Sequence, residues 1–247
     1  MWAKTSAIWL ILAAAAVAQD DDAKKKDEEA KAKIAEFKKE LKTAKADKDV
    51  ARAIEGLGGL QHPRVMTELK SYLSKGGDVA TAAAEQIAKY KKDKDAGETL
   101  VGAAGATKDK DLTVKLIRYA GDVEYKGIVS KLSNLFRHKE VDAAKEAVDS
   151  CAKLRSKDAI DPLLNLWKEM EAIKEETKSG KNDTGLGGLG AGLGVGASMQ
   201  DEQLKRKREL TPAVETALKK ITNEEFKDLR AANDWWRKNK GTFKDLE

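Results

Sequence analysis

The sequence predicts an all-α protein, a short right-handed α-solenoid built from helical hairpins. Apolar residues recur at helical spacing along most of the chain, and no run alternates apolar and polar residues as a half-buried strand would. An acidic residue followed by an apolar one opens a helical pattern at intervals of about 30 residues, which is typical of a repeat array. The three prolines lie at or near predicted helix starts, where a missing amide hydrogen is tolerated.

The first element, residues 1–18, has the pattern of a signal peptide. Lys4 is followed by the apolar run Ile8–Val17, and the small residues Ala16 and Ala18 flank Val17 before Gln19. The run is shorter than the roughly 20 apolar residues that cross a bilayer. We expect cleavage after Ala18 and a secreted or periplasmic location. If the segment stayed uncleaved it would anchor the chain, and only then is contact with a membrane expected.

Residues 19–46 are predicted to be a charged N-terminal segment and a capping helix. The part that begins at Asp20 is rich in acids and lysines, and we expect it to be disordered. The helix that follows carries a single apolar stripe with helical spacing. The stripe consists of Ala30, Ile34, Phe37, Leu41 and Ala44.

Residues 47–174 hold the predicted repeats, each with two amphipathic helices and a short polar turn. The first helices open at Asp49, Asp78, Asp111 and Glu140. The second helices carry apolar stripes that start at Val65, Ile128 and Ile160, and the remaining one is residues 95–107. Each stripe needs a neighbouring repeat to cover it.

The helix over residues 95–107 is the least regular of these predictions. Gly97, Gly102 and Gly105 each disfavour a helix by about 1 kcal/mol relative to alanine. We therefore expect this helix to be distorted or to pack unusually close to a neighbour.

Three segments resemble HEAT-like (armadillo-type) repeats of the secreted bacterial type. The segment 156–167, SKDAIDPLLNLW, resembles the opening of a second helix in such repeats, and 78–88, DVATAAAEQIA, resembles the matching first helix. Residues 217–240 are similar to the closing part of secreted HEAT-like proteins. The resemblance implies a solenoid of stacked hairpins. The units are shorter than the usual HEAT length of about 40–47 residues, so the repeat class is left open.

Residues 175–210 are predicted to be a polar and glycine-rich mobile insertion with a basic helix. Gly185–Gly190 matches the GxGxxG pattern, but no strand precedes it, so a dinucleotide site is not expected. The glycine-rich part, 185–197, is either a loop between repeats or an arm that orders against a partner. The basic run Lys205–Arg208 is interpreted as a solvated helix face.

Residues 211–247 are predicted to form the last repeat helices and a C-terminal cap. Thr211 and Pro212 would cap and start the first of these helices. Trp235 and Trp236 are expected to close the end of the core. The alternative is that they form an aromatic platform for a carbohydrate or another ligand.

Charge and cysteine content narrow the possible functions. Charged residues make up 36% of the chain, yet acids and bases are interspersed and the net charge is only +5, so nucleic acid is not an expected partner. Cys151 is the only cysteine and cannot form an internal disulfide. Its apolar neighbours predict a buried packing residue.

No motif predicts catalysis. His62 and His138 are the only histidines, and neither has a cysteine or second histidine at metal-ligand spacing. No GxSxG sequence occurs. We therefore expect no catalytic residue, no metal and no cofactor, and predict that the protein is not an enzyme.

The leading hypothesis is a non-catalytic exported scaffold that binds a protein partner on the concave row of second helices. Geometry places four residues off the apolar stripe on this surface: Lys131, Asn134, Asn165 and Lys168. One alternative is an enzyme or a lyase-like accessory protein, because some HEAT-like proteins are phycobilin lyases; a reactive Cys151 would favour it. The other is an envelope-attached structural protein, which an uncleaved N-terminus would favour.

Overall fold

The protein is all-α, as predicted. The computed structural model describes residues 6–173 and 193–245, and every regular element in these ranges is helical. The helices pack against their neighbours in a way compatible with a helical-repeat protein. The chain divides into two compact units, residues 1–90 and 91–247, which are described separately. Among the described residues, no helix has the length and apolar character to cross a membrane.

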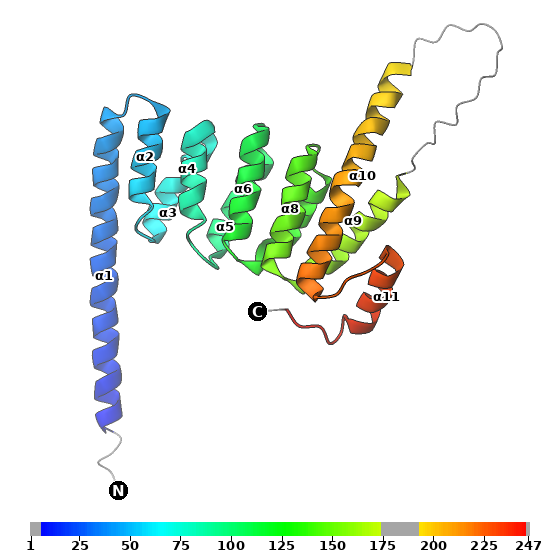
Figure 1. Ribbon diagram of the computed structural model, residues 1–247. Helices are drawn as coiled ribbons and strands as arrows, with labels where there is room; N and C mark the ends of the chain where they lie inside the picture. Colours follow the sequence, from blue (N-terminus) through cyan, green and yellow to red (C-terminus); the bar gives the residue numbers. More distant parts are fainter. Residues whose placement is uncertain (1–5, 174–192, 246–247) are drawn as a thin grey trace, which may run out of the picture. The chain divides into compact units, whose positions relative to one another are not determined.

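Unit 1 begins with one long helix followed by three shorter ones. Its elements are α1 (Ser6–Thr43), α2 (Asp47–Leu57), α3 (Pro63–Lys70), the 3-10 turn η1 (Leu73–Lys75) and α4 (Gly77–Ile87). Helix α2 packs between α1 and α4, and α3 contacts both α1 and α4 (Figure 1).

Helix α1 confirms the predicted apolar stripe but starts much earlier than expected. Ala30 and Phe37 are buried, and the Phe37 ring meets Tyr72 edge-on with 5.6 Å between centroids. The acidic start at Asp20 lies inside the helix, so the prediction of disorder there is wrong. Asp27 and Lys31 form an i,i+4 ion pair of 3.0 Å, the kind of contact that supports a charged helix.

The turn before α3 is held by side chains rather than by regular structure. The Nδ1 atom of His62 accepts a hydrogen bond from the amide of Arg64 at 3.2 Å, so this histidine caps the helix that Pro63 begins. The hydroxyl of Tyr90 accepts from the amide of His62 at 3.1 Å. His62 therefore has a structural role in the turn.

Unit 2 contains the remaining hairpins. Its elements are α5 (Lys94–Ala106), α6 (Lys110–Asp122), η2 (Lys126–Ile128), α7 (Val129–Asn134), η3 (Leu135–Arg137), α8 (Val141–Leu154), η4 (Lys157–Ala159), α9 (Ile160–Ala172), α10 (Leu193–Thr222) and α11 (Leu229–Asn239). Within this unit α6, α8 and α10 lie side by side in chain order, with α8 in contact with both of the others (Figure 1). Helix α9 packs against α10 and α11.

The predicted helix starts of the hairpins are confirmed to within about two residues, the usual uncertainty of a helix boundary. Two of them are fixed by aspartate caps: Asp93 accepts from the amide of Ala96 at 2.8 Å, and Asp109 accepts from the amide of Leu112 at 3.1 Å. Neither cap is one of the acidic residues that mark the repeats in the sequence: Asp109 lies two residues before Asp111, and Asp93 precedes a second helix.

The glycines of α5 match the expectation at one position only. A Cβ atom at Gly97 would lie 3.1 Å from the Cγ2 methyl of Ile128, so this glycine permits close packing. Gly102 and Gly105 have nothing within 4 Å of such an atom. The helix forms in spite of all three.

The first helices α6 and α8 approach each other closely at Gly121 of α6. A Cβ atom built there would lie 2.7 Å from the Oγ and 2.9 Å from the Cβ of Ser150 in α8. The Ser150 hydroxyl, which is fully buried, donates to the carbonyl oxygen of Ile117 at 3.1 Å. Nearby, Arg118 and Glu146 form an ion pair of 2.9 Å between the same two helices.

Helix α10 differs from the prediction at its start. It runs without interruption from Leu193 to Thr222, with Pro212 in its interior, so the expectation that Thr211 and Pro212 begin a helix is wrong. The glycine-rich segment 185–197 lies outside the described residues as far as position 192, and residues 193–197 belong to α10.

The basic run on α10 is partly structural. Arg206 is half-buried and donates to the carbonyl oxygen of His138 at 2.8 Å and to that of Phe136. Lys207, also half-buried, donates to the carbonyl oxygen of Ile173 at 3.0 Å. These bonds satisfy carbonyl groups at helix ends. The interpretation as a solvated face is correct for Lys205 and Arg208 and wrong for Arg206 and Lys207.

Candidate functional site

The four residues predicted to bind a partner lie on two second helices of unit 2. Lys131 and Asn134 belong to α7, Asn165 and Lys168 belong to α9, and all four are exposed. Two of them line a common groove, whereas the other two do not. The structure therefore places Asn134 and Asn165 in one groove, and Lys131 and Lys168 outside that groove.

This groove, called here the second-helix groove, has a volume of about 170 Å³. It is lined by side chains from α7, η3 and α9: Ser133, Asn134, Phe136, Arg137, Pro162, Asn165, Leu166 and Glu169. Phe136 and Leu166 are buried, so the apolar part of the lining is packed into the core. The exposed amides and one hydroxyl provide its hydrogen-bonding groups.

One edge of the second-helix groove is closed by an ion pair. The Nε of Arg137 donates to Glu169 at 3.2 Å, and a second guanidinium nitrogen also contacts that carboxylate. This hydrogen bonding raises the pKa of Arg137 above its ordinary value. Lys131, outside the groove, pairs with Glu98 of α5 at 3.2 Å. The fixed charges beside the groove are therefore mostly neutralised.

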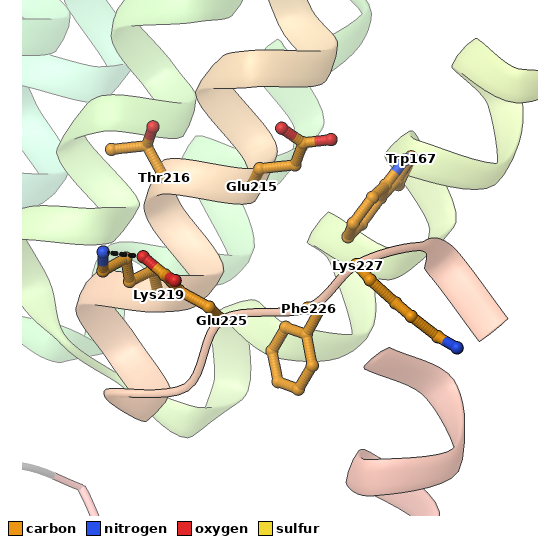
Figure 2. A pocket seen from close by; sticks show the side chains of 7 residues that line it. All are labelled: Trp167, Glu215, Thr216, Lys219, Glu225, Phe226 and Lys227. Carbon is orange, nitrogen blue, oxygen red and sulfur yellow. Dashed lines mark hydrogen bonds and ion pairs between the residues drawn. The ribbon is translucent and has the colours of Figure 1, made fainter. Parts of the chain in front are cut away.

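A second concave site lies near the C-terminal end of unit 2. This cavity, called here the Trp167 cavity, has a volume of about 570 Å³ and is drawn in Figure 2. Trp167 of α9, three residues of α10 and residues 225–227 of the following connection line it. The α10 residues are Glu215, Thr216 and Lys219. No feature of the sequence pattern pointed to this site, because its walls come from separate elements.

The paired tryptophans lie beside this cavity and pack against the chain. Trp236 is buried, and its Nε1 donates to the carboxylate of Asp161 at 2.8 Å. Trp235 is half-buried and stacks on Trp236 with ring centroids 6.3 Å apart. Phe243 meets Trp235 and Trp236 edge-on. The expectation that the pair closes the core is confirmed for Trp236.

Cys151 and His138, two of the residues considered for catalysis, are engaged in packing and in a turn hydrogen bond. Cys151 is fully buried in α8, as predicted, and burial raises the pKa of its thiol to about 12. The Nδ1 atom of His138 accepts from the amide of Glu140 at 3.1 Å. Across residues 6–173 and 193–245 no group of three or more metal-ligating side chains comes together.

Comparison with known proteins assigns no family, so the class of protein is defined by the fold alone. No family model matches the chain, and no curated protein matches it. The helices and their packing define an all-α protein compatible with the helical-repeat class.

Proposed function

We propose that the protein is a non-catalytic, exported scaffold of the HEAT-like class, a short right-handed α-solenoid that binds a protein partner in the second-helix groove. The observation that carries this proposal is the groove itself, in which exposed Asn134 and Asn165 from consecutive second helices line one surface. The stacking of α6, α8 and α10 in chain order supports the repeat architecture.

The chemistry of the groove suits a polypeptide. An asparagine amide offers both a donor and an acceptor, as a peptide group does, so two such amides can hold a main chain by paired hydrogen bonds. Buried Phe136 and Leu166 form the apolar floor beneath them. The near-neutral surroundings favour recognition by hydrogen bonding and shape rather than by net charge, which is consistent with the expectation that nucleic acid is not a partner.

Site-directed photo-crosslinking tests the groove directly. A benzoyl-phenylalanine crosslinker would be placed at position 134 or 165, and at position 115 as the control, because Lys115 is exposed on first helix α6. The proposal expects one protein to be captured from the two groove positions and not from position 115. Equal capture from all three positions, or capture from none, would reject the second-helix groove as the binding surface.

Substitution provides an independent measurement once the partner is in hand. The double variant Asn134→Ala and Asn165→Ala removes up to four neutral hydrogen bonds and should weaken binding by about tenfold or more, since each such bond contributes about 0.5–1.5 kcal/mol. Lys168→Ala tests whether the surface extends beyond the groove, and Lys115→Ala should leave affinity unchanged.

Export is tested by the mass of the mature chain. Expression in a bacterium, followed by intact-mass measurement of the extracytoplasmic fraction, should give a protein that begins at Gln19. A full-length chain held in the membrane fraction would instead support the envelope-attached alternative. The lyase-like alternative is disfavoured by the burial of Cys151, whose thiol has no solvent access.

A further inference from the structure

The Trp167 cavity has the size of a ligand site and one wall that is fixed by burial. Its volume of about 570 Å³ falls within the range of about 300–1,000 Å³ typical of pockets for small organic groups. Trp167 is 3% exposed and therefore held in place by packing. Phe226 is supported by Trp235, with 5.5 Å between ring centroids. Two aromatic side chains from different elements thus line one cavity.

Glu215 and Lys227 carry the two charges at this cavity that form no ion pair among the described side chains. Lys219 lies one turn further along α10 and would be the usual i,i+4 partner of a glutamate. Its amine is bonded instead to the carboxylate of Glu225 on the connection. Lys227 extends away from the space between Glu215 and Trp167, as Figure 2 shows. The carboxylate of Glu215 is therefore the charge that lies near Trp167 without a counter-charge among the described side chains.

We propose that the Trp167 cavity binds the guanidinium group of an arginine side chain from another polypeptide. A guanidinium is planar and weakly hydrated, so it can stack on an aromatic ring such as that of half-buried Phe226 while two of its N–H groups bond one carboxylate. An ammonium group is a compact, strongly hydrated charge and fits this combination less well. Thr216 adds a hydroxyl oxygen that can accept a further hydrogen bond.

This site is separate from the second-helix groove, and the proposal goes beyond partner binding in that groove. Either site can be occupied without the other, because their linings share no residue. A failed crosslinking experiment at positions 134 and 165 would therefore leave the guanidinium site standing, and the reverse also holds.

The test is a nuclear magnetic resonance titration of the isotope-labelled full chain. The indole N–H signal of Trp167 would be assigned by its loss in Trp167→Phe, and its shift would be followed as Nα-acetyl-arginine amide is added. Nα-acetyl-citrulline amide is the neutral control of nearly the same shape. Butylguanidine and butylamine test the free small molecule and the ammonium ion.

Glu215→Gln is the decisive variant, and Glu224→Gln is its matched control, because Glu224 is exposed nearby but does not line the cavity. Glu215 is itself exposed, so its substitution should leave the fold intact, which circular dichroism verifies. Glu215→Asp keeps the charge on a shorter stem and should bind with intermediate affinity. We expect Glu215→Gln to weaken the binding of acetyl-arginine amide by about tenfold or more, because a charge-assisted hydrogen bond is lost. Glu224→Gln should leave the affinity unchanged.

Several outcomes would overturn the proposal. Citrulline binding as tight as arginine would show that charge has no role, and full affinity in Glu215→Gln would remove the assigned carboxylate. Butylamine binding as tight as butylguanidine would reject the guanidinium assignment. Binding of butylguanidine with exclusion of acetyl-arginine amide would reject a polypeptide source. No shift of the Trp167 signal with any of the four compounds would reject the site.

Discussion

Replacing Gly121 by alanine tests the close contact between α6 and α8 in unit 2. The added Cβ would lie 2.7 Å from the Oγ and 2.9 Å from the Cβ of Ser150, with the Ser150 backbone Cα at 3.2 Å. Contacts below about 3 Å between such atoms require either α6 or α8 to shift. The buried Ser150 hydroxyl has little freedom to turn away, because it donates to the carbonyl oxygen of Ile117.

Two opposing effects set the size of the stability change that Gly121→Ala causes. Overpacking a well-packed interface typically destabilises by about 1–3 kcal/mol. Alanine favours a helix over glycine by at most about 1 kcal/mol, and by less here, because Gly121 lies in the last turn of α6. We therefore expect a net loss of about 1 kcal/mol in the free energy of unfolding. For a unit of this size that loss lowers the unfolding midpoint by about 2–4 °C.

The matched control is Gly102→Ala in α5. Gly102 is an exposed interior helix position of the same unit, and nothing lies within 4 Å of a Cβ atom there. Only the propensity effect remains, so this substitution should stabilise unit 2 by up to about 1 kcal/mol. Urea unfolding followed by tryptophan fluorescence measures both variants, because Trp167, Trp235 and Trp236 all lie in unit 2.

The two glycine variants should thus change stability in opposite directions. Ser150→Gly removes the two nearest atoms, and in its background Gly121→Ala should lose most of its penalty, with a coupling energy of about 1 kcal/mol. If Gly121→Ala stabilised the protein as much as Gly102→Ala does, the close approach of α6 and α8 would be wrong.

Three further predictions concern one thiol and two charged groups. Cys151 should react with a thiol reagent only when urea unfolds the protein, because burial raises the thiol pKa to about 12; rapid reaction in the native protein would contradict its burial. Arg206→Ala should destabilise unit 2 by about 1–3 kcal/mol by leaving two carbonyl groups without donors, whereas Lys205→Ala, measured alongside by urea unfolding, should not. The hydrogen bond from Arg64 lowers the pKa of Asp27 from 3.8 to about 2. A lowered native pKa stabilises above the ordinary value, so the stability difference between wild type and Asp27→Asn should vanish as the pH falls from 3.8 through about 2; a difference that persists below that range in acid titrations would refute the pairing.

The hairpins were predictable because their signals are local. The helix start expected at Asp111 lies one residue from the observed start at Lys110, and the stripe that follows is set by residues within that one helix. The same holds for the burial of Cys151, whose neighbours along α8 are apolar. Periodicity alone therefore located both helices of each repeat.

The candidate sites depend on contacts between distant segments, which periodicity does not contain. Asn134 and Asn165 were selected as residues off the apolar stripe, and they share a groove because α7 and α9 are neighbours. Lys131 was selected by the same rule, yet it faces Glu98 of α5. The Trp167 cavity needs α9, α10 and the following connection together, so no sequence window could reveal it.

The continuous path of α10 through Pro212 shows how tertiary contacts can override a local stop signal. A proline inside a helix removes one hydrogen bond and crowds the preceding turn, at a cost of about 3 kcal/mol. On the N-terminal side, Arg206 and Lys207 bond carbonyl groups of η3, the turn after it and the end of α9. On either side of the proline, Leu210 and Val214 are fully buried. Burying two such side chains contributes roughly 1.5–3 kcal/mol each, which together matches or exceeds the proline penalty and is consistent with one helix through residues 206–214.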